Sequence, residues 1–314
     1  MPSDPPTLSI VIPLCNECES LAELHGQIVA VLEADGLSAE IVFIDDGSRD
    51  TSWAVVETLC AKDVRVRGIR FRRNFGKAAA LAAGFARVRG SIVVTMDADL
   101  QDDPAEIPAF LKRLDGGLDL VTGWKRKRFD PWHKVFPSRV FNGMVSRLTG
   151  VRLHDHNCGM KAFRSEIARK LRMYGERHRF VPVFAASLGY RVGEMEIHHR
   201  SRQFGRSKYG FTRFIKGFLD LLAVAFQTRY GLRPMHVLGT VGLLALGLGF
   251  AGGACWLVGL LSGVETLSAM GLPGGVLFLV GTQSMLAGLI SELLTARTAE
   301  PADGFDIAAE AGSS

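Results

Sequence analysis

The sequence predicts an α/β protein with a doubly wound, mostly parallel sheet, followed by an amphipathic helix and two C-terminal membrane helices. Short apolar stretches alternate with helix-like stretches through the first 124 residues, which is the pattern of such a sheet. Near the end, residues 237–261 and 266–291 contain no charged side chain. Each of these runs exceeds the roughly 20 residues that a helix needs to cross a bilayer.

The elements follow from these patterns in order. Apolar and β-branched residues predict strands at 8–14, 39–48, 64–71, 91–99 and 118–124. Helical spacing predicts helices at 19–36, 51–62, 76–88 and 104–114. Beyond residue 124 the chain is basic and irregular, with short helices expected at 138–149 and 180–188, a strand at 191–198 and a loop at 198–210.

Residues 211–226 place apolar side chains on one helical face, as expected of a helix lying in a membrane interface. A helix that faces an ordinary protein core is the alternative, because amphipathicity alone does not distinguish the two.

Polar clusters follow four of the predicted strands: "CNE", "DDGS", "RRNFGK" and "DADLQ". In a doubly wound sheet, ligands bind outside the carboxyl ends of the strands. We therefore expect the four clusters to meet at one edge of the sheet and to form the functional site there.

The two apolar runs are expected to anchor the chain in the inner membrane. Arg229 and Arg233 precede the first run and Arg297 follows the second, whereas the loop at 262–271 has no Lys or Arg. By the positive-inside rule, both termini and the domain at 1–210 are then cytoplasmic. A buried apolar hairpin is the alternative. The expected organisation is a cytosolic domain at 1–210, a juxtamembrane helix at 211–233, an anchor at 234–297 and a disordered tail at 298–314.

Small residues in the two runs predict that the membrane helices pair. Gly249 and Gly253 have Gly-xxx-Gly spacing in the first run, and Gly271 and Gly275 have it in the second. Glycine at this spacing lets helices approach closely, and it also leaves homo-oligomerisation open.

The charge distribution indicates a phosphate-bearing or anionic lipid partner. Residues 125–233 hold 24 Lys and Arg against 7 Asp and Glu, while the rest of the chain holds 13 against 25. A basic block directly before a membrane segment is typical of a surface for anionic headgroups or phosphates. No nucleic-acid-binding motif occurs, so nucleic acid is not expected as a partner. The CxxC at Cys15 and Cys18 lacks the second pair of a zinc site and is interpreted as coincidence.

Asp97 and Asp99 follow the predicted strand at 91–99 and are the best candidates for metal ligands. Alternate residues of an extended segment project to one side, so both carboxylates and then Gln101 can face one ion. Hard oxygen ligands suit Mg²⁺ or Mn²⁺, which often complete their coordination with substrate phosphates. Solvated loop carboxylates are the alternative.

Five stretches in this order resemble the motifs of family-2 glycosyltransferases with the GT-A fold: "LSIVIPLCNECES", "IVFIDDGSRDTS", "RNFGKAAALAAGF", "MDADLQDDP" and "HHRSRQFGRSKYG". More narrowly, the chain resembles the polyprenyl-phosphate glycosyltransferases, which include dolichol-phosphate mannose synthase and bacterial undecaprenyl-phosphate sugar transferases. The resemblance implies inverting transfer of a sugar from a UDP- or GDP-linked donor to a polyprenyl phosphate at the cytoplasmic membrane face. It does not identify the sugar.

The resemblance also implies roles for particular residues. Asp97 would lie by the nucleotide, while Asp99 and Gln101 would bind the metal that bridges the diphosphate. Asp155 would contact sugar hydroxyls, with a turn cap as the alternative. The nucleotide would be held by Pro13, Leu14, Asn16, Glu17, Asp45, Asp46, Asn74, Gly76 and Asp97.

A lipid monophosphate has a second pKa of about 6 and is largely dianionic at neutral pH, so no general base is needed to create the nucleophile. Catalysis should depend on positioning and on stabilising the charge of the leaving group. We expect Lys125 and Arg139 to fix the acceptor phosphate. The wider acceptor and lid set is Lys125, Arg126, Arg128, Arg139, Arg202, Arg206, Ser207 and Lys208.

Two other functions are considered. A processive polysaccharide synthase has a Q-x-x-R-W element and more membrane helices, whereas here Ser207 follows Gln203–Arg206. A catalytically inactive nucleotide-sugar-binding membrane protein is disfavoured by the presence of Asp97, Asp99 and Gln101.

Overall fold

A computed structural model of the chain describes residues 6–126, 132–198, 200, 212–231 and 233–298. Most of the expected loop at 198–210 and nearly all of the expected tail at 298–314 lie outside these residues. The chain divides into two compact units, Met1–Ala225 and Phe226–Ser314, each described here by itself.

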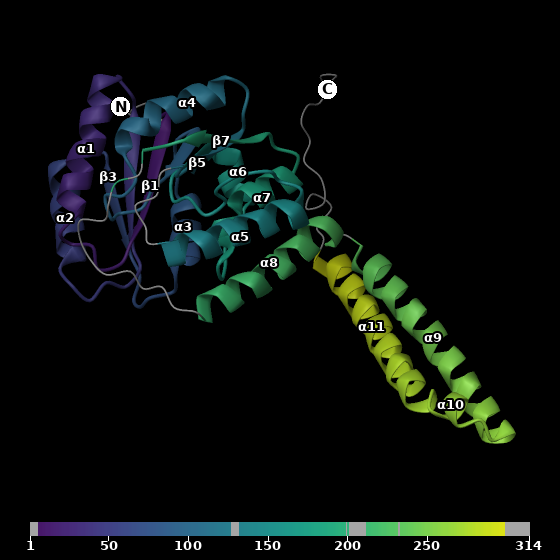
Figure 1. Cartoon of the computed structure of the whole chain (residues 1–314). Helices are drawn as coiled ribbons and strands as arrows, with labels where there is room; N and C mark the ends of the chain where they lie inside the picture. Colours follow the sequence, from purple (N-terminus) through teal and green to yellow (C-terminus); the bar gives the residue numbers. More distant parts are fainter. Residues whose placement is uncertain (1–5, 127–131, 199, 201–211, 232, 299–314) are drawn as a thin grey trace. The chain divides into compact units, whose positions relative to one another are not determined.

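The first unit is built on a seven-stranded mixed sheet, with strand order β3-β2-β1-β4-β6-β5-β7 (Figure 1). Parallel pairing joins β1 to β2, β1 to β4, β2 to β3 and β5 to β7, so the predicted mostly parallel sheet is confirmed. The strands are β1 (Leu8–Leu14), β2 (Ala39–Asp45), β3 (Val66–Arg70), β4 (Ile92–Thr95), β5 (Leu120–Trp124), β6 (Lys161–Arg164) and β7 (Val192–Glu196).

Helices cover both faces of this sheet because the side chains of its central strands are apolar on both sides. In β1, Ile10 and Ile12 belong to one core cluster and Val11 to the other. The first cluster is completed by α1 (Leu21–Ala34), α2 (Ser52–Lys62) and α4 (Ile107–Asp115), the last preceded by the 3₁₀ turn η1 (Pro104–Glu106). The second is completed by α3 (Lys77–Phe85), α6 (Ser165–Lys170) and α7 (Val181–Ser187), the last preceded by η2 (Arg177–Phe180).

Strand β6 was not predicted, because its four residues lie in a stretch that the sequence analysis treated as irregular. It inserts antiparallel between β4 and β5, with Thr95 opposite Lys161. This strand has only four residues, starts with Lys and ends with Arg, so its sequence lacks the apolar alternation that predicts a strand. Its insertion places Lys161 directly beside the end of β4.

Strand β4 ends earlier than predicted, and this corrects the argument about Asp97 and Asp99. The strand stops at Thr95, and the chain then turns, with Leu100 at a φ of 62°. The two carboxylates therefore lie on a turn, so the extended register that placed them on one side is wrong. Their exposure differs accordingly: the Asp97 side chain is 34% exposed, whereas Asp99 is 7% exposed.

A third, smaller core joins α5 (Trp132–Thr149) to α8 (Thr212–Tyr230). Leu221 and Val224 of α8 pack in it with Val145 of α5, so this side of α8 faces a protein core. Leu219 and Leu222 are 58% and 44% exposed. Helix α8 thus buries Leu221 and Val224 in a protein core and leaves the apolar side chains of Leu219 and Leu222 exposed.

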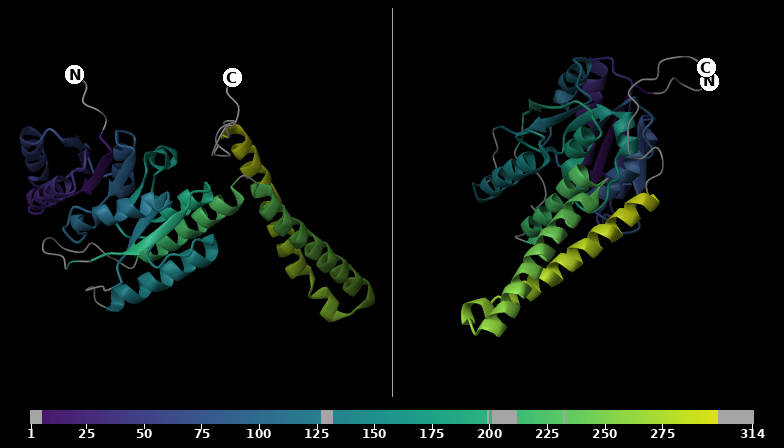
Figure 2. Two further views of the ribbon diagram at one scale, coloured as in Figure 1. Left: turned by 90° about the horizontal axis from the view of Figure 1, so that it is seen from above. Right: turned by 90° about the vertical axis from the view of Figure 1, so that its right-hand side faces the viewer.

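The second unit contains two long apolar helices, α9 (Pro234–Ser262) and α11 (Gly271–Thr298), joined through the short α10 (Glu265–Ser268). Both are long and apolar enough to be candidate membrane spans. They run side by side in every view (Figures 1 and 2).

One glycine of each predicted pair, Gly249 and Gly271, lies against the other helix, and the remaining close contacts come from glycines outside these pairs. A Cβ atom on Gly249 or Gly252 would meet backbone of α11, but one on Gly253 or Gly275 would meet nothing within 4 Å. On α11 the contacts come from Gly271, Gly274, Gly281 and Gly288, and the last three are spaced seven residues apart. A seven-residue repeat keeps one seam of a helix facing its partner, which the Gly-xxx-Gly pattern did not reveal.

Candidate active site

The loops that follow β1 and β2 are held together by side-chain hydrogen bonds, so the predicted meeting of strand ends is confirmed here. The Asn16 N–H donates to Ser48 Oγ (2.9 Å), and Asn16 Oδ1 accepts from the Arg49 N–H (2.8 Å). The Glu17 N–H donates to Ser52 Oγ (2.9 Å). Asn16 has a φ of 59°, which asparagine tolerates better than most residues. Part of what this asparagine does is therefore structural.

Asp45 and Asp46 at the end of β2 make different contacts. Asp45 is fully buried, and its Oδ1 accepts from the Ser48 N–H at 2.7 Å. Its Oδ2 has no hydrogen-bond partner among the described residues, and the nearest cation is Arg70, whose Nε lies 3.6 Å away. Buried polar atoms are usually satisfied, so this oxygen lacks the hydrogen bond that a buried carboxylate oxygen normally has.

Asp46 instead fixes the start of α3. Its two carboxylate oxygens accept from the backbone N–H groups of Phe75 (2.7 Å) and Gly76 (2.9 Å). Asn74 Nδ2 donates to the Asp46 backbone oxygen (3.2 Å) and so ties the same loops together. Gly76 has a φ of 94°, in the region that favours glycine. These contacts set the position of Lys77, the first residue of α3.

The turn after β4 collects acidic side chains and places cations against them. The Lys77 ammonium forms an ion pair with Asp97 Oδ1. Lys125, from the end of β5, lies with its Nζ 3.0 Å from Oδ1 of the fully buried Asp102. The Asp97 N–H donates to Asp102 Oδ2 at 3.3 Å, which connects the two pairs.

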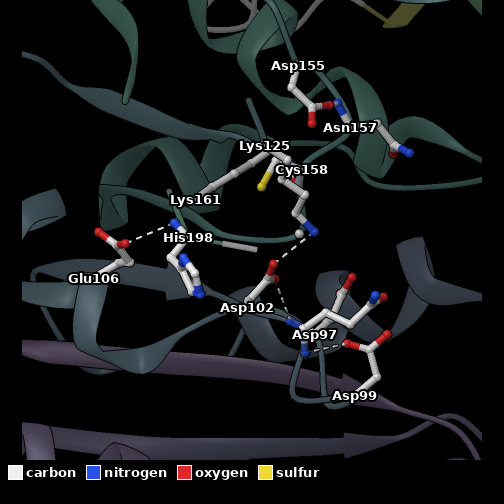
Figure 3. A network of polar contacts seen from close by, with 12 residues as sticks. Asp97, Asp99, Asp102, Glu106, Lys125, Asp155, Asn157, Cys158, Lys161 and His198 are labelled. Carbon is white, nitrogen blue, oxygen red and sulfur yellow. Dashed lines mark hydrogen bonds and ion pairs between the residues drawn. The ribbon is translucent and has the colours of Figure 1, made fainter. Parts of the chain in front are cut away.

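Asp99 and Gln101 are arranged by a local turn. The Gln101 N–H donates to Asp99 Oδ1 at 3.2 Å. Figure 3 shows the carboxylates of Asp97, Asp99 and Asp102 on one side of the network and the segment around Asp155 and Asn157 on the other. Lys125 lies between them and reaches toward Asp102.

The opposite wall of the site is the segment before β6. Thr95 Oγ1 donates to the Gly159 carbonyl (2.8 Å), which holds this segment against the end of β4. A Cβ atom on Gly159 would lie 2.6 Å from Asp97 Oδ2 and 2.8 Å from Asp102 Oδ2. Only glycine therefore fits between the two carboxylates. Asp155 is buried, and its Oδ1 accepts from the Asn157 N–H at 3.1 Å, as the turn-cap alternative expected.

Opposite charges outweigh burial at the two ion pairs. Burial disfavours the charged form of Asp97, yet the Lys77 ammonium holds the pKa of the Asp97 carboxyl well below its usual range. Burial likewise opposes the charge on Lys125, but the Asp102 carboxylate raises the pKa of the Lys125 ammonium. Lys77, Asp97 and Lys125 are therefore ionised at neutral pH.

At Lys161 and Cys158 burial is the main influence on the pKa, and it favours the neutral form of each side chain. Burial lowers the pKa of the Lys161 ammonium, which donates to the Cys158 carbonyl, and raises the pKa of the Cys158 thiol to about 12. Cys158 is therefore a protonated thiol at neutral pH and an unsuitable nucleophile. A small hollow is lined in part by Pro13, Lys77, Asp97 and Lys161.

The remaining predicted residues are spread more widely. Leu14 is buried in the sheet core, so its backbone alone is available to a ligand. Arg126 forms an ion pair with Glu196 of β7 (3.2 Å), and Arg139 is exposed on α5. No contact between described residues joins Arg139 to Lys125. The side chains of Arg128, Arg202, Arg206, Ser207 and Lys208 lie outside the described residues.

Sequence reasoning assigned no role to Lys77, Asp102 or Lys161, although the first two lay within quoted motifs. Lys77 ends the "RRNFGK" cluster, Asp102 belongs to "MDADLQDDP", and Lys161 lies in the basic stretch beyond residue 124. Their positions at strand ends were the available signal. Which lysine would meet which carboxylate could not be inferred, because the partners come from different strands.

The acidic turn fits a catalytic metal ion of the kind that substrate phosphates help to hold. Among the described residues, no three His, Cys, Asp or Glu side chains cluster as a complete metal site. Mg²⁺ commonly takes only one or two carboxylates and completes its shell with phosphates and water. Asp97 and Asp99 can supply these, and Asp97 is paired with the Lys77 ammonium in this structure.

Comparisons with known proteins place the chain in a family. The "Glycosyl transferase family 2" pattern matches residues 9–172. Dodecaprenyl-phosphate galacturonate synthase of Rhizobium johnstonii is 35% identical, over 93% of this chain and 88% of its own length. Undecaprenyl-phosphate 4-deoxy-4-formamido-L-arabinose transferase of Shewanella sediminis is 36% identical, over 91% of this chain and 86% of its own length.

A solved structure shares the fold. Glucosyl-3-phosphoglycerate synthase of Mycobacterium tuberculosis, crystallised with Mn²⁺, UDP and glucosyl-3-phosphoglycerate, has a TM-score of 0.56 and 18% identity. The match covers 71% of this chain and 80% of that one. At this identity the likeness concerns the GT-A fold alone.

Proposed function

We propose that this chain, which belongs to glycosyltransferase family 2, transfers a sugar from a UDP- or GDP-linked donor to a polyprenyl phosphate, with inversion at the anomeric carbon. The observation that carries the proposal is the acidic turn Asp97–Asp102 at the carboxyl edge of the sheet. Lys77, Lys125 and Lys161, from three other parts of the chain, lie beside it. The two polyprenyl-phosphate sugar transferases at 35% and 36% identity support the choice of acceptor.

We propose Mg²⁺ or Mn²⁺ as the cofactor, held by Asp97, Asp99 and Gln101 together with the donor diphosphate. When bound, a divalent ion neutralises the negative charge that develops on the departing diphosphate. The buried Asp45 Oδ2 is proposed to accept a hydrogen bond from the nucleotide, with Pro13, Asn16, Glu17, Asn74 and Gly76 near it.

The protein's own groups are proposed to bind, orient and balance charge. An acceptor phosphate oxygen forms a bond to the anomeric carbon from one face, while the bond from that carbon to the diphosphate oxygen breaks on the other. The acceptor is already dianionic, so no side chain needs to remove a proton. Lys125 supplies fixed positive charge beside the reaction, in a partly buried site where such charge acts strongly. Asp155 is proposed to hold sugar hydroxyls.

We propose that α9 and α11 anchor the chain in the inner membrane with the catalytic unit on the cytoplasmic side. Support comes from the length and apolar composition of these helices and from the arginines that flank them. The exposed Leu219 and Leu222 of α8 support a place for that helix in the membrane interface. Arg126, Arg128, Arg139, Arg202, Arg206, Ser207 and Lys208 are proposed to serve the lipid phosphate.

The test is a transfer assay with the full chain in nanodiscs. Radiolabelled UDP- and GDP-sugars are offered with a polyprenyl phosphate and Mn²⁺, and label is followed into the organic phase. We expect transfer from one donor class, loss of transfer in Asp99→Ala with the fold retained, and a product of inverted configuration. The proposal is wrong if no donor delivers label to the lipid. Label in a water-soluble polymer would instead indicate a processive synthase.

A further inference from the structure

Two ion pairs meet at the acidic turn, and they differ in how accessible they are. In the Lys125–Asp102 pair the side chains are 15% and 0% exposed. In the Lys77–Asp97 pair they are 33% and 34% exposed. Breaking the first pair would leave a buried carboxylate without its charge partner, which is costly. The second pair can open toward solvent, so it is the exchangeable one.

Lys77 can leave Asp97 without any change in the fold. Its backbone is fixed because Asp46 accepts hydrogen bonds from the Phe75 and Gly76 N–H groups just before it. Its side chain has a flexible four-carbon stem, so the ammonium can move several ångströms while α3 stays in place. The same ammonium lines the hollow that also contains Asp97 and Lys161. A new anionic partner arriving there would be within its reach.

The charge balance of the site opposes either ligand when it binds alone. A divalent cation must displace Lys77 from Asp97 and approach Lys125, which repels it. A diphosphate must approach Asp97 and its neighbouring carboxylates, which repel it in turn. When the cation and the diphosphate bind together, the cation binds the Asp97 carboxylate and the diphosphate binds the Lys77 ammonium. Each charged group then has a partner of opposite charge.

We propose that Lys77 is an internal substitute for the metal ion. In the ligand-free enzyme the Lys77 ammonium pairs with Asp97, and when metal and donor bind it moves to the diphosphate. This inference rests on the proposed function, because it takes the acidic turn to be the metal and diphosphate site. Its consequence is positive coupling: nucleotide strengthens metal binding, and by thermodynamic reciprocity metal strengthens nucleotide binding by the same factor. Lys77 is thus a positioning residue that keeps the site from loading with metal alone.

The test measures binding and needs no turnover. The full chain in nanodiscs is titrated with Mn²⁺, and free Mn²⁺ is followed by electron paramagnetic resonance, with and without saturating UDP or GDP. In the wild type we expect nucleotide to tighten Mn²⁺ binding by about tenfold or more, within the usual range for coupled sites. In Lys77→Gln we expect nucleotide-free Mn²⁺ binding to tighten by about tenfold and the coupling to shrink correspondingly.

Three further variants make the result specific. Lys112→Gln removes the same charge from the exposed side of α4 and should leave both Mn²⁺ affinities unchanged. Lys77→Arg keeps a cation at the position and should retain most of the coupling. Asp97→Asn in the Lys77→Gln background should abolish the gain in Mn²⁺ affinity, because the site of competition is gone. Thermal unfolding midpoints establish that each variant is folded.

The outcomes separate this inference from the proposed function. If Mn²⁺ binds to the wild type and to Lys77→Gln with equal nucleotide-free affinity, Lys77 does not compete with metal and the inference is overturned, while the proposed function stands. If the folded chain binds no Mn²⁺ even with nucleotide, the proposed metal site is wrong and the inference falls with it. A gain that persists in Lys77→Gln/Asp97→Asn would place the ion elsewhere and would also overturn the inference.

Discussion

Lys125 Nζ lies 3.0 Å from Oδ1 of Asp102, and the Asp102 side chain is completely shielded from solvent. The pair joins the end of β5 to the turn that follows β4. The Asp97 N–H also donates to Asp102. Asp102, to which the sequence assigned no role, therefore contacts both Lys125 and the acidic turn.

Replacing Asp102 should destabilise the first unit. Asp102→Asn leaves Lys125 charged and without its partner, which costs about 3 kcal/mol in comparable buried pairs. That corresponds to a melting temperature lower by about 6–12 °C in a domain of this size. The measurement is thermal unfolding of the full chain in detergent. Asp102→Asn/Lys125→Met removes both charges and should recover most of the loss; a double variant no more stable than the single one contradicts this account.

Gly159→Ala should impair transfer without unfolding the protein. The added methyl group would lie 2.6 Å from Asp97 Oδ2, so the carboxylate has to move away from its position beside Lys77. We expect the transfer rate to fall by at least about tenfold, as misplacement of a catalytic group commonly does. Gly143→Ala on α5, where a Cβ meets nothing within 4 Å, is the matched control and should keep full activity. Equal rates for the two variants would refute the steric argument.

Asp46→Asn should lower stability even when no nucleotide is present. The change removes a charge that accepts two backbone hydrogen bonds at the start of α3, which together stabilise by about 2 kcal/mol or more. Thermal unfolding measures the loss, and Asp115→Asn at the exposed end of α4 serves as the control for charge. An unchanged melting temperature combined with weaker nucleotide binding would instead assign Asp46 to ligand contact alone.

Acid should destabilise the first unit partly through Asp63. The Arg65 side chain donates to Asp63 and His25 Nε2 lies 3.0 Å from its Oδ2; these contacts, Arg65 first, lower the pKa of Asp63 from 3.8 to about 2. A carboxyl with a depressed folded-state pKa stabilises the fold above its unfolded pKa, and this contribution is lost as pH falls from about 4 to about 2.

Asp63→Asn should therefore show a flatter loss of stability across that pH window than the wild type. The melting temperature as a function of pH measures it. Asp35→Asn, at the exposed end of α1, should keep the wild-type slope. Parallel curves for the wild type and Asp63→Asn would show that this contact does not contribute to acid sensitivity.

The neighbouring glycines of α11 should differ sharply in tolerance. A Cβ on Gly274 would lie 2.9 Å from α9 backbone, whereas one on Gly275 would meet nothing within 4 Å. Gly274→Val should separate the two helices and lower the thermal stability of the second unit in detergent, while Gly275→Val should not. Protease resistance of the helical pair gives a second measurement. If Gly275→Val is the more damaging change, the pairing described here is incorrect.

Much of the fold was predictable because its signals are local. The alternation of strands and helices from Leu8 to Trp124 follows from the period of apolar residues, and the order of those elements implies a doubly wound sheet. Strand β6 escaped prediction because four residues bounded by Lys161 and Arg164 carry no such period. The prediction that Asp97 and Asp99 lie in an extended segment was wrong because the chain turns after Thr95. A hydropathy pattern does not indicate a single positive φ such as that of Leu100.

The sequence by itself determined which chemical groups stand at the carboxyl edge of the sheet, because each polar cluster directly follows a strand and parallel strands end on the same side. It also determined the two apolar helices, since their length and lack of charge are local properties. Only the tertiary structure decided that Lys77 pairs with Asp97 and Lys125 with Asp102. Such pairing depends on how separate strands and loops pack together, and a charge has no preference for one opposite charge over another until packing brings the two within reach.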